Sequence, residues 1–169
     1  MSLLYCHHDS PVGPLLLAGD GTALRLLSFP TGRKAVAPEA DWQPDPAPFD
    51  TVRHQLDAYF SGDLRAFSVP LEIRGTAFQK KIWAALATIP YGETRSYGAI
   101  ARALGTPGAS RAVGAANGAN PLPIILPCHR VIGKSGALTG FGGGLDTKTW
   151  LLQHEATTAG VAGRQLSLF

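Results

Sequence analysis

Cys128 and His129 stand next to each other within the run Pro127 to Val131, and this pairing suits a nucleophile. A thiolate is strongly nucleophilic, and a nearby imidazole can help to remove the thiol proton. The chain of 169 residues contains only two cysteines, so we do not expect a disulfide framework. Two interpretations remain open at this point. Cys128 is either a reactive thiol or a buried core thiol that happens to precede a histidine.

Neither cysteine has the surroundings of a metal site. Around Cys128 no further Cys or His residues cluster at the spacing of metal ligands. Cys6, His7 and His8 are adjacent in sequence, whereas metal ligands usually converge from separated positions. We therefore predict no metal and no cofactor.

Charge is divided unequally along the chain. Residues 1–74 carry 6 Lys and Arg against 9 Asp and Glu, a net charge of −3, and residues 75–169 carry 9 against 3, a net charge of +6. The basic half also contains Cys128, which favours a polyanionic partner such as nucleic acid. No apolar run approaches the ~20 residues of a membrane-spanning helix, and no signal peptide is recognisable. These features, with two unpaired cysteines, predict a cytoplasmic protein without membrane attachment.

The N-terminal half has the pattern of a small α+β module. Residues 13–29 alternate apolar blocks around Gly19 to Gly21, which predicts an antiparallel hairpin. The proline-rich stretch 37–50 predicts a surface loop. Apolar residues then recur at helical spacing from Phe49 to Phe60, with Asp50 as the expected cap and Gly62 as the stop. A short strand is predicted at 67–73.

The C-terminal half has the pattern of a helix-turn-helix. Thr76 and Gln79 form a capping-box pattern before a helix whose apolar face is Phe78, Ile82, Leu86 and Ile89. Ser96 is the expected cap of a second helix, 97–104, which Gly105 ends. A third helix is predicted at 110–117. Helix, tight turn and helix together indicate a DNA-binding motif.

The third helix has very little side-chain bulk. Alanine and glycine fill most of it, and Arg111 is its one long side chain. Such a slim helix is narrow enough for a minor groove about 6 Å wide. Tight packing inside the protein would also explain the composition, but the basic surroundings favour DNA.

The segment Arg111 to Glu155, RAVGAANGANPLPIILPCHRVIGKSGALTGFGGGLDTKTWLLQHE, resembles the active-site region of O6-alkylguanine-DNA alkyltransferases, also called methylated-DNA–protein-cysteine methyltransferases. The similarity extends back to about Thr76, and more loosely over the N-terminal half. It implies an α+β protein of two domains. The first, 1–74, is a ribonuclease H-like antiparallel sheet with a helix. The second, 75–169, is a mostly helical, winged helix-turn-helix-like domain that carries the active site.

The resemblance also implies the activity and its residues. In the family, the cysteine takes an alkyl group from the O6 of guanine in a stoichiometric event, after the damaged nucleotide is flipped out of the duplex. The residues that would carry the reaction are Cys128, His129, Glu155, Asn120 and Tyr97. The residues that would contact DNA are Arg111, Ser96, Ala112, Ala115, Asn117 and Arg130. The residues that would line the pocket are Tyr97, Pro123, Val131, Phe141, Gly142 and Lys148.

Each of the main roles follows the chemistry of the side chain. His129, acting through a water and oriented by Glu155, would remove the thiol proton. Tyr97 would donate to the leaving base, and Arg111 would fill the space that the flipped nucleotide vacates. Phe141 stands where many members have tyrosine and Gly142 where some have serine, so only the backbone donor remains there. Asp20 stands where a cysteine ligand would be, so the structural zinc of some members is not expected.

Partners and alternatives complete the sequence interpretation. The expected partner is duplex DNA containing O6-alkylguanine, and the protein is expected to be a monomer. The tail Gln165 to Phe169 is similar to peptides that dock on the DNA sliding clamp, although a free or self-packing tail fits equally well. Activity on O4-alkylthymine is left open. A non-catalytic lesion-binding protein and a Cys-His-Glu hydrolase are the competing functions.

Overall fold

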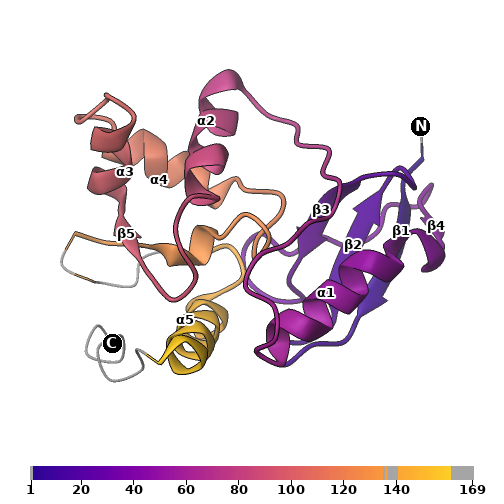
Figure 1. Ribbon diagram of the computed structural model, residues 1–169. Coiled ribbons are helices and arrows are strands. Elements are labelled where there is room, and N and C mark those ends of the chain that lie inside the picture. The colour runs from indigo at the N-terminus through magenta and orange to yellow at the C-terminus, as the bar shows by residue number, and fades with distance from the viewer. Residues whose placement is uncertain (1, 135, 137–140, 161–169) are drawn as a thin grey trace.

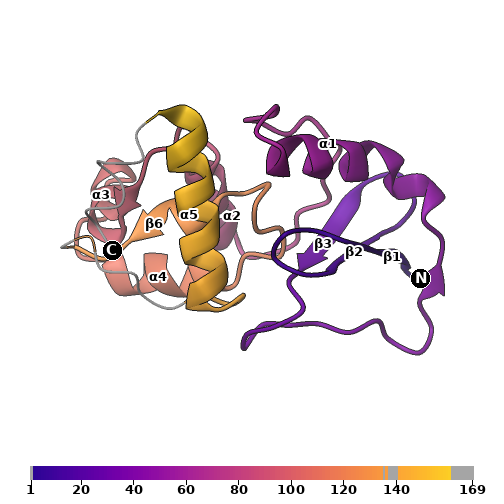
Figure 2. The same ribbon diagram turned by 90° about the horizontal axis from the view of Figure 1, so that it is seen from below.

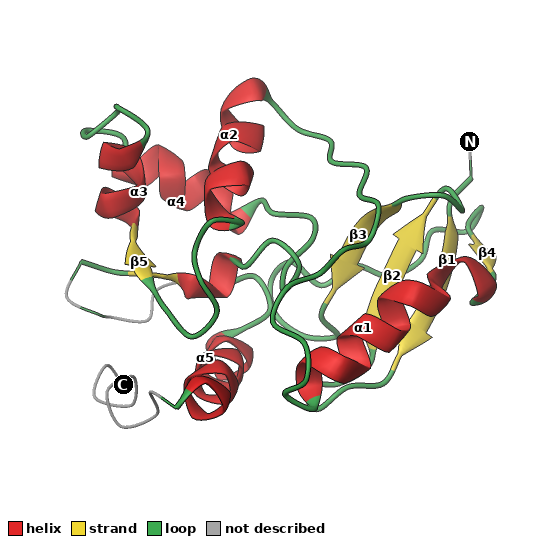
Figure 3. Cartoon of the chain, in the orientation of Figure 1, coloured by secondary structure: helices red, strands yellow, loops and turns green. Residues whose placement is uncertain are grey.

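The computed structural model describes residues 2–134, 136 and 141–160. They form a sheet-and-helix half and a mostly helical half (Figure 1, Figure 3). The N-terminal half contains, in order, β1 (Leu4–His8), β2 (Leu15–Gly19), β3 (Leu24–Ser28), β4 (Gln43–Pro44), the 3-10 turn η1 (Ala47–Phe49) and α1 (Asp50–Phe60). The C-terminal half contains α2 (Ala77–Leu86), β5 (Arg95–Ser96), α3 (Tyr97–Ala103), α4 (Ser110–Gly118), the 3-10 turn η2 (Cys128–Arg130), β6 (Val131–Ile132) and α5 (Leu145–Ala159). The predicted α+β class is confirmed.

The N-terminal sheet has the strand order β3-β2-β1-β4. Neighbouring strands are antiparallel except for β1 and β4, which are parallel. The predicted hairpin is confirmed as β2 and β3, and the Asp20 carboxylate accepts the backbone N–H groups of Thr22 and Ala23 in the turn. Helix α1 covers one face of this sheet (Figure 2). The strand β2 is buried along its whole length, so it forms the centre of this half.

Two local predictions in the N-terminal half are wrong. The stretch 67–73 makes only an isolated bridge, between Leu24 and Leu71, because Pro70 has no N–H with which to continue a ladder. Asp50 does not cap α1 either. The 3-10 turn η1 runs directly into the helix, so Phe49 takes the cap position without a side-chain hydrogen bond.

The helix signals of the C-terminal half are confirmed. Thr76 and Gln79 form both hydrogen bonds of the capping box of α2, and the Ser96 hydroxyl accepts the backbone N–H of Ala99 at the start of α3. Phe78, expected on the buried face of α2, is instead exposed, whereas Trp83 is buried and its indole N–H donates to the Ala116 carbonyl at 2.9 Å. This contact fixes α2 against α4, which follows α3 in the helix-turn-helix.

A single hydrophobic cluster runs through both halves. It includes Leu15 and Leu17 of the sheet, Tyr59 of α1, Ile82 of α2 and the thiol-bearing Cys128. Because the same core serves both halves, their relative position is fixed by packing. Within the ranges that the structure describes, the helices are all too short or too polar to cross a bilayer.

Candidate active site

Cys128 is the first residue of η2 and follows a segment that is held in an uncommon conformation. Ile124, in this segment, is the one non-glycine residue with a positive φ, 74°, within the described ranges. That region is unfavourable for a β-branched residue. The Asn120 side chain braces the segment, since its amide donates to the Leu126 carbonyl at 2.7 Å and its oxygen accepts the Leu122 N–H at 2.9 Å. Asn120 therefore positions the turn that presents Cys128.

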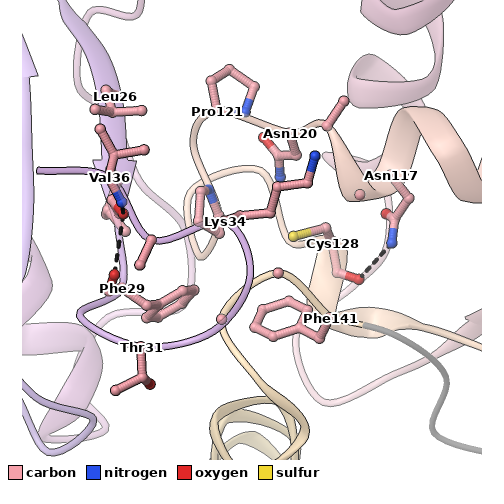
Figure 4. Close-up of a pocket in the computed structure, with 18 residues that line it drawn as sticks. Leu26, Phe29, Thr31, Lys34, Val36, Asn117, Asn120, Pro121, Cys128 and Phe141 are labelled. Atoms are coloured by element: carbon pink, nitrogen blue, oxygen red, sulfur yellow. Dashed lines mark hydrogen bonds between the residues drawn. The ribbon is translucent and has the colours of Figure 1, made fainter.

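The Cys128 side chain opens on a cavity of about 270 Å³ between the two halves (Figure 4). Strand β3 and the segment after it form one wall, while the end of α4 and the residues that precede α5 form the other. The predicted site residues that line this cavity are Asn117, Asn120, Pro123, Cys128, Phe141 and Gly142. The Phe141 ring packs against Phe29 of the N-terminal half, with centroids 5.6 Å apart. The site is therefore built jointly by both halves.

Beside the cysteine, the carboxylate of Glu155 forms hydrogen bonds with four residues from three segments. His129 Nε2 lies 2.6 Å from Oε2, and Arg130 donates to both carboxylate oxygens, at 2.8 and 3.1 Å. The Tyr59 hydroxyl donates to Oε2 at 2.6 Å, and the Gly92 N–H donates to Oε1 at 3.3 Å. Glu155 and His129 are almost completely buried. The carboxylate is therefore fixed in place and fixes the imidazole in turn.

This contact also determines which nitrogen of His129 can act as a base. An ionised carboxylate only accepts hydrogen bonds, so the proton of the neutral ring lies on Nε2, facing Glu155. Burial lowers the pKa of His129 and outweighs the opposing effect of Glu155, so the ring is neutral at pH 7. Among the described residues Nδ1 is buried and makes no hydrogen bond. It is the nitrogen left to accept a proton.

The resting thiol is not ionised. Burial raises the pKa of Cys128 to about 11, although the Asn120 amide and the positive charge of Lys148 act against this. At pH 7 a thiol with this pKa is a thiolate in roughly one molecule in 10⁴. Glu155, by contrast, remains a carboxylate. Burial alone would raise its pKa, but His129 and Arg130 together hold it well below its usual value.

Lys148 lies in the interior of the site. Its ammonium donates to the Val131 carbonyl at 2.6 Å, and burial lowers the pKa of Lys148 to about 8. The side chain is fully buried, so Lys148 is not a solvated lysine on the surface of α5. Lys148 and Val131, both expected to line the pocket, are not among the residues that line the cavity.

A second, more open hollow of about 640 Å³ adjoins the first and shares Lys34, Gly118 and Gly142 with it. Tyr97 lines this second hollow together with Gly114 and Ala115 of α4. Arg111, Ala112 and Ala115 are exposed on α4, and Ser96 is half-buried at the start of α3. An exposed face of small residues, with a single arginine at its start, leads to the mouth of the site.

Comparison with known proteins identifies the family. Residues 3–73 match the family model described as "6-O-methylguanine DNA methyltransferase, ribonuclease-like domain", and residues 77–157 match "6-O-methylguanine DNA methyltransferase, DNA binding domain". The chain belongs to this family. Close homologues in this methyltransferase family move an alkyl group from DNA to a protein cysteine.

Individual relatives cover almost the whole chain. The methylated-DNA–protein-cysteine methyltransferase of Mycobacterium bovis is 55% identical over 151 residues, which are 89% of this chain and 91% of the relative. The protein of the same name from Methanosarcina acetivorans is 50% identical over 92% of this chain and 99% of the relative. The crystal structure of Mycobacterium tuberculosis OGT in complex with DNA has a TM-score of 0.87 and 52% identity, covering 98% of this chain and 99% of that one.

Two sequence-based assignments for this methyltransferase need correction. Arg130 was expected to contact DNA, but it is buried, paired with Glu155 and bonded to the Ile89 carbonyl at 2.7 Å. Asn117 was expected on the DNA-facing side of α4, but it is also buried, and its amide donates to the Cys128 carbonyl at 3.3 Å. Both side chains support the site from inside the protein and are not available to a phosphate.

The sequence interpretation also missed residues of the N-terminal half of this methyltransferase. Tyr59 belongs to the apolar residues that recur at helical spacing from Phe49 to Phe60, but nothing local indicated its bond to Glu155, 96 positions away. Lys34, which lines both hollows, lies in a loop with no motif.

The sequence does contain a signal for the burial of Asn117. It follows the buried Val113 by four residues, which puts both on one helix face.

Proposed function

We propose that this protein repairs O6-alkylguanine in duplex DNA by transferring the alkyl group to Cys128, and that each molecule acts once. The observation that carries the assignment is the position of the thiol. Cys128 opens on a cavity next to an imidazole whose Nδ1 is free among the described residues and whose Nε2 is held by Glu155. The other cysteine, Cys6, is buried in β1 and is not among the residues that line this cavity.

In the proposed reaction one bond forms and one breaks. The Cys128 sulfur attacks the alkyl carbon while the bond from that carbon to O6 breaks, and its electron pair remains on guanine. The thiol proton passes to Nδ1 of His129 through a bridging water. The guanine anion that leaves takes up a proton from solvent, and the His129 imidazolium returns its proton to solvent, so the net result is transfer of the thiol proton to guanine. The product is a thioether. Since thioethers are poor electrophiles, Cys128 is consumed.

The pocket groups recognise the extruded base. The carbonyls of Cys128 and Val131 accept from the exocyclic amine of guanine, while the Gly142 backbone donates toward O6 and Pro123 lines the space for the alkyl group. The Cys128 carbonyl already accepts from the Asn117 amide and the Val131 N–H, and the Val131 carbonyl accepts from Lys148. A carbonyl oxygen has two lone pairs, so the Val131 carbonyl retains the capacity to accept from the base, whereas the Cys128 carbonyl must exchange one of its present donors for the base. Tyr97 donates to the base as negative charge develops on it.

The small-residue face of α4 enters the minor groove, and Arg111 occupies the space of the flipped nucleotide. Ala112 and Ala115 allow close approach to the groove, and Ser96 contacts the backbone. Exposure of Arg111, Ala112 and Ala115 supports this arrangement. The unusual composition of α4 therefore has a functional reason, because a bulkier helix would hold the duplex away from the site.

The domain boundaries, the cellular location and the binding partners are also part of the proposal. Residues 1–74 form one domain, and residues 75–169 form the DNA-binding and alkyl-accepting domain of a monomer that acts in the cytoplasm. The tail Gln165 to Phe169 docks on the DNA sliding clamp. It lies outside the described residues, so this part of the proposal rests on the sequence.

Mass spectrometry of the modified protein tests the assignment. The protein is incubated with duplex DNA containing O6-methylguanine, and the mass of the peptide containing Cys128 is measured. We expect a gain of a single methyl group that stops at one equivalent, in the wild type and in Cys6→Ala. Tight binding without methyl gain would indicate a lesion-binding protein, and sustained ester hydrolysis would indicate a hydrolase. Repair of the DNA by Cys128→Ala would contradict the assignment.

A further inference from the structure

Arg33 and Lys34 of the N-terminal half line the open hollow beside α4. The other residues that line it are Tyr97, Gly114, Ala115, Gly118 and Gly142. Strand β3 ends at Ser28, and the segment that follows it carries both cations toward the face of α4. Lys34 extends across the neighbouring cavity on the side of Asn120 and Cys128 (Figure 4). The acidic half of the chain thus places two positive charges at the mouth of the site.

Backbone contacts fix the position of this segment. The Lys34 N–H donates to the Gly142 carbonyl at 3.1 Å. Gly32, with φ of 95°, packs so closely that a Cβ there would lie 2.1 Å from the same carbonyl oxygen. Since Gly142 lines both hollows, Arg33 and Lys34 keep a constant place relative to the pocket.

Side-chain contacts distinguish the other cations of residues 2–74 from Arg33 and Lys34. Arg25 and Arg74 both pair with Glu72, Arg53 donates to His8, and Arg65 lies over the Tyr91 ring. For Arg33 and Lys34 no carboxylate partner occurs among the described residues, and both side chains are exposed. Their charge is therefore available to an anion from outside.

We propose that Arg33 and Lys34 bind backbone phosphates of the damaged DNA strand, next to the nucleotide that is extruded into the pocket. The inference rests on the proposed function, because that function brings the duplex onto α4. The strand must pass from the groove to the pocket mouth, and the hollow between Tyr97, Gly114 and Arg33 lies on that route. Arginine suits phosphate because its guanidinium can make two parallel hydrogen bonds.

The test measures binding to a labelled duplex without a lesion, over a range of salt concentrations. We expect Arg33→Ala to bind about three- to ten-fold more weakly, and the slope of log affinity against log salt to fall by about 0.9 for the lost phosphate contact. Lys34→Ala should behave similarly. The matched control is Arg53→Ala, since Arg53 lies on α1, on the helix-covered side of the sheet (Figure 2). It removes the same charge and should leave the slope unchanged.

A second measurement separates DNA contact from an effect on the pocket. Arg33→Ala should react with free O6-benzylguanine at the wild-type rate, because a free base has no phosphate. Equal slowing with free base and with DNA would overturn the proposal. So would wild-type affinity and slope in Arg33→Ala while Arg111→Ala weakens binding. These outcomes leave the proposed function intact, which fails instead if wild-type Cys128 gains no alkyl group.

Discussion

The phenolic hydroxyl of Tyr59 donates a 2.6 Å hydrogen bond to the carboxylate of Glu155, and so connects the first helix of the chain to the last. Both groups are buried. Burial, reinforced by the adjacent carboxylate, raises the pKa of Tyr59 well above its ordinary value, so this hydroxyl is protonated and donates at neutral pH. The N-terminal half thus contributes directly to the group that orients His129.

Removing that hydroxyl should destabilise the protein. Tyr59→Phe leaves the carboxylate with one donor fewer in a dry environment, and we expect the free energy of unfolding to fall by about 1–3 kcal/mol. Urea unfolding measures the change. In the control, Tyr5→Phe, the lost hydroxyl makes no hydrogen bond within the described part of the chain, and the effect should be well below 1 kcal/mol. Equal effects of the two variants would contradict the prediction.

Neutralising the carboxylate should cost more than removing one of its donors. Glu155→Gln leaves the buried Arg130 guanidinium without its counter-charge, a change that typically costs about 3–5 kcal/mol. Alkyl transfer should slow as well, because His129 loses its charged acceptor. The control Glu93→Gln breaks an exposed pair with Arg95 and should cost less than about 1 kcal/mol. Calorimetry and a transfer assay on the same samples would reveal whether both effects occur together.

The site should make the protein sensitive to acid. The folded state keeps His129 neutral and Glu155 ionised, since both pKa values are lowered from their ordinary values. As the pH falls, the unfolded chain takes up protons on both side chains before the folded protein does, so stability declines below about pH 6.5 and further near pH 4.5. Denaturation midpoints between pH 4 and 8 measure the decline. In Glu155→Gln the second phase should be smaller, and an unchanged profile would argue against this assignment.

Gly32 should be more sensitive to substitution than other glycines with positive φ. In Gly32→Ala the new methyl group would meet the backbone of Gly142 and Gly143, so the wall of the cavity must shift. We expect a loss of stability of about 1–3 kcal/mol and slower alkyl transfer. At Gly105, also with positive φ, a Cβ would have no atom within 4 Å. Gly105→Ala should therefore cost roughly 1 kcal/mol and leave the transfer rate unchanged, a difference that single-turnover kinetics can resolve.

Local signals predicted the elements of this fold well, and distant partners poorly. The capping box at Thr76 and the cap at Ser96 act within a few residues, so the sequence contains the whole cause of each helix start. The strand predicted at 67–73 did not form. Its apolar composition suggested a strand, but Pro70 lacks the backbone N–H that a strand ladder needs.

The site residues show the same difference between local signals and distant partners. The similarity around Cys128 implied the neighbours His129 and Glu155, and the structure brings His129 and Glu155 into contact. Arg130 was placed on the DNA on the basis of the family resemblance. Its burial depends on Glu155 of α5 and on Ile89 and the Tyr91 ring, which lie in the connection between α2 and β5. No spacing in the sequence reveals this convergence, which exists only once the C-terminal half has folded.

The raised pKa of Cys128 has a consequence for the lifetime of the unused protein. Small electrophiles in a cell attack thiolates, and a thiol with a pKa of about 11 offers very little thiolate to them. Cys128, which can react only once, is thereby preserved until a base in the pocket brings its alkyl carbon next to the thiol. Burial thus protects the thiol of each molecule from other electrophiles until the protein meets a lesion.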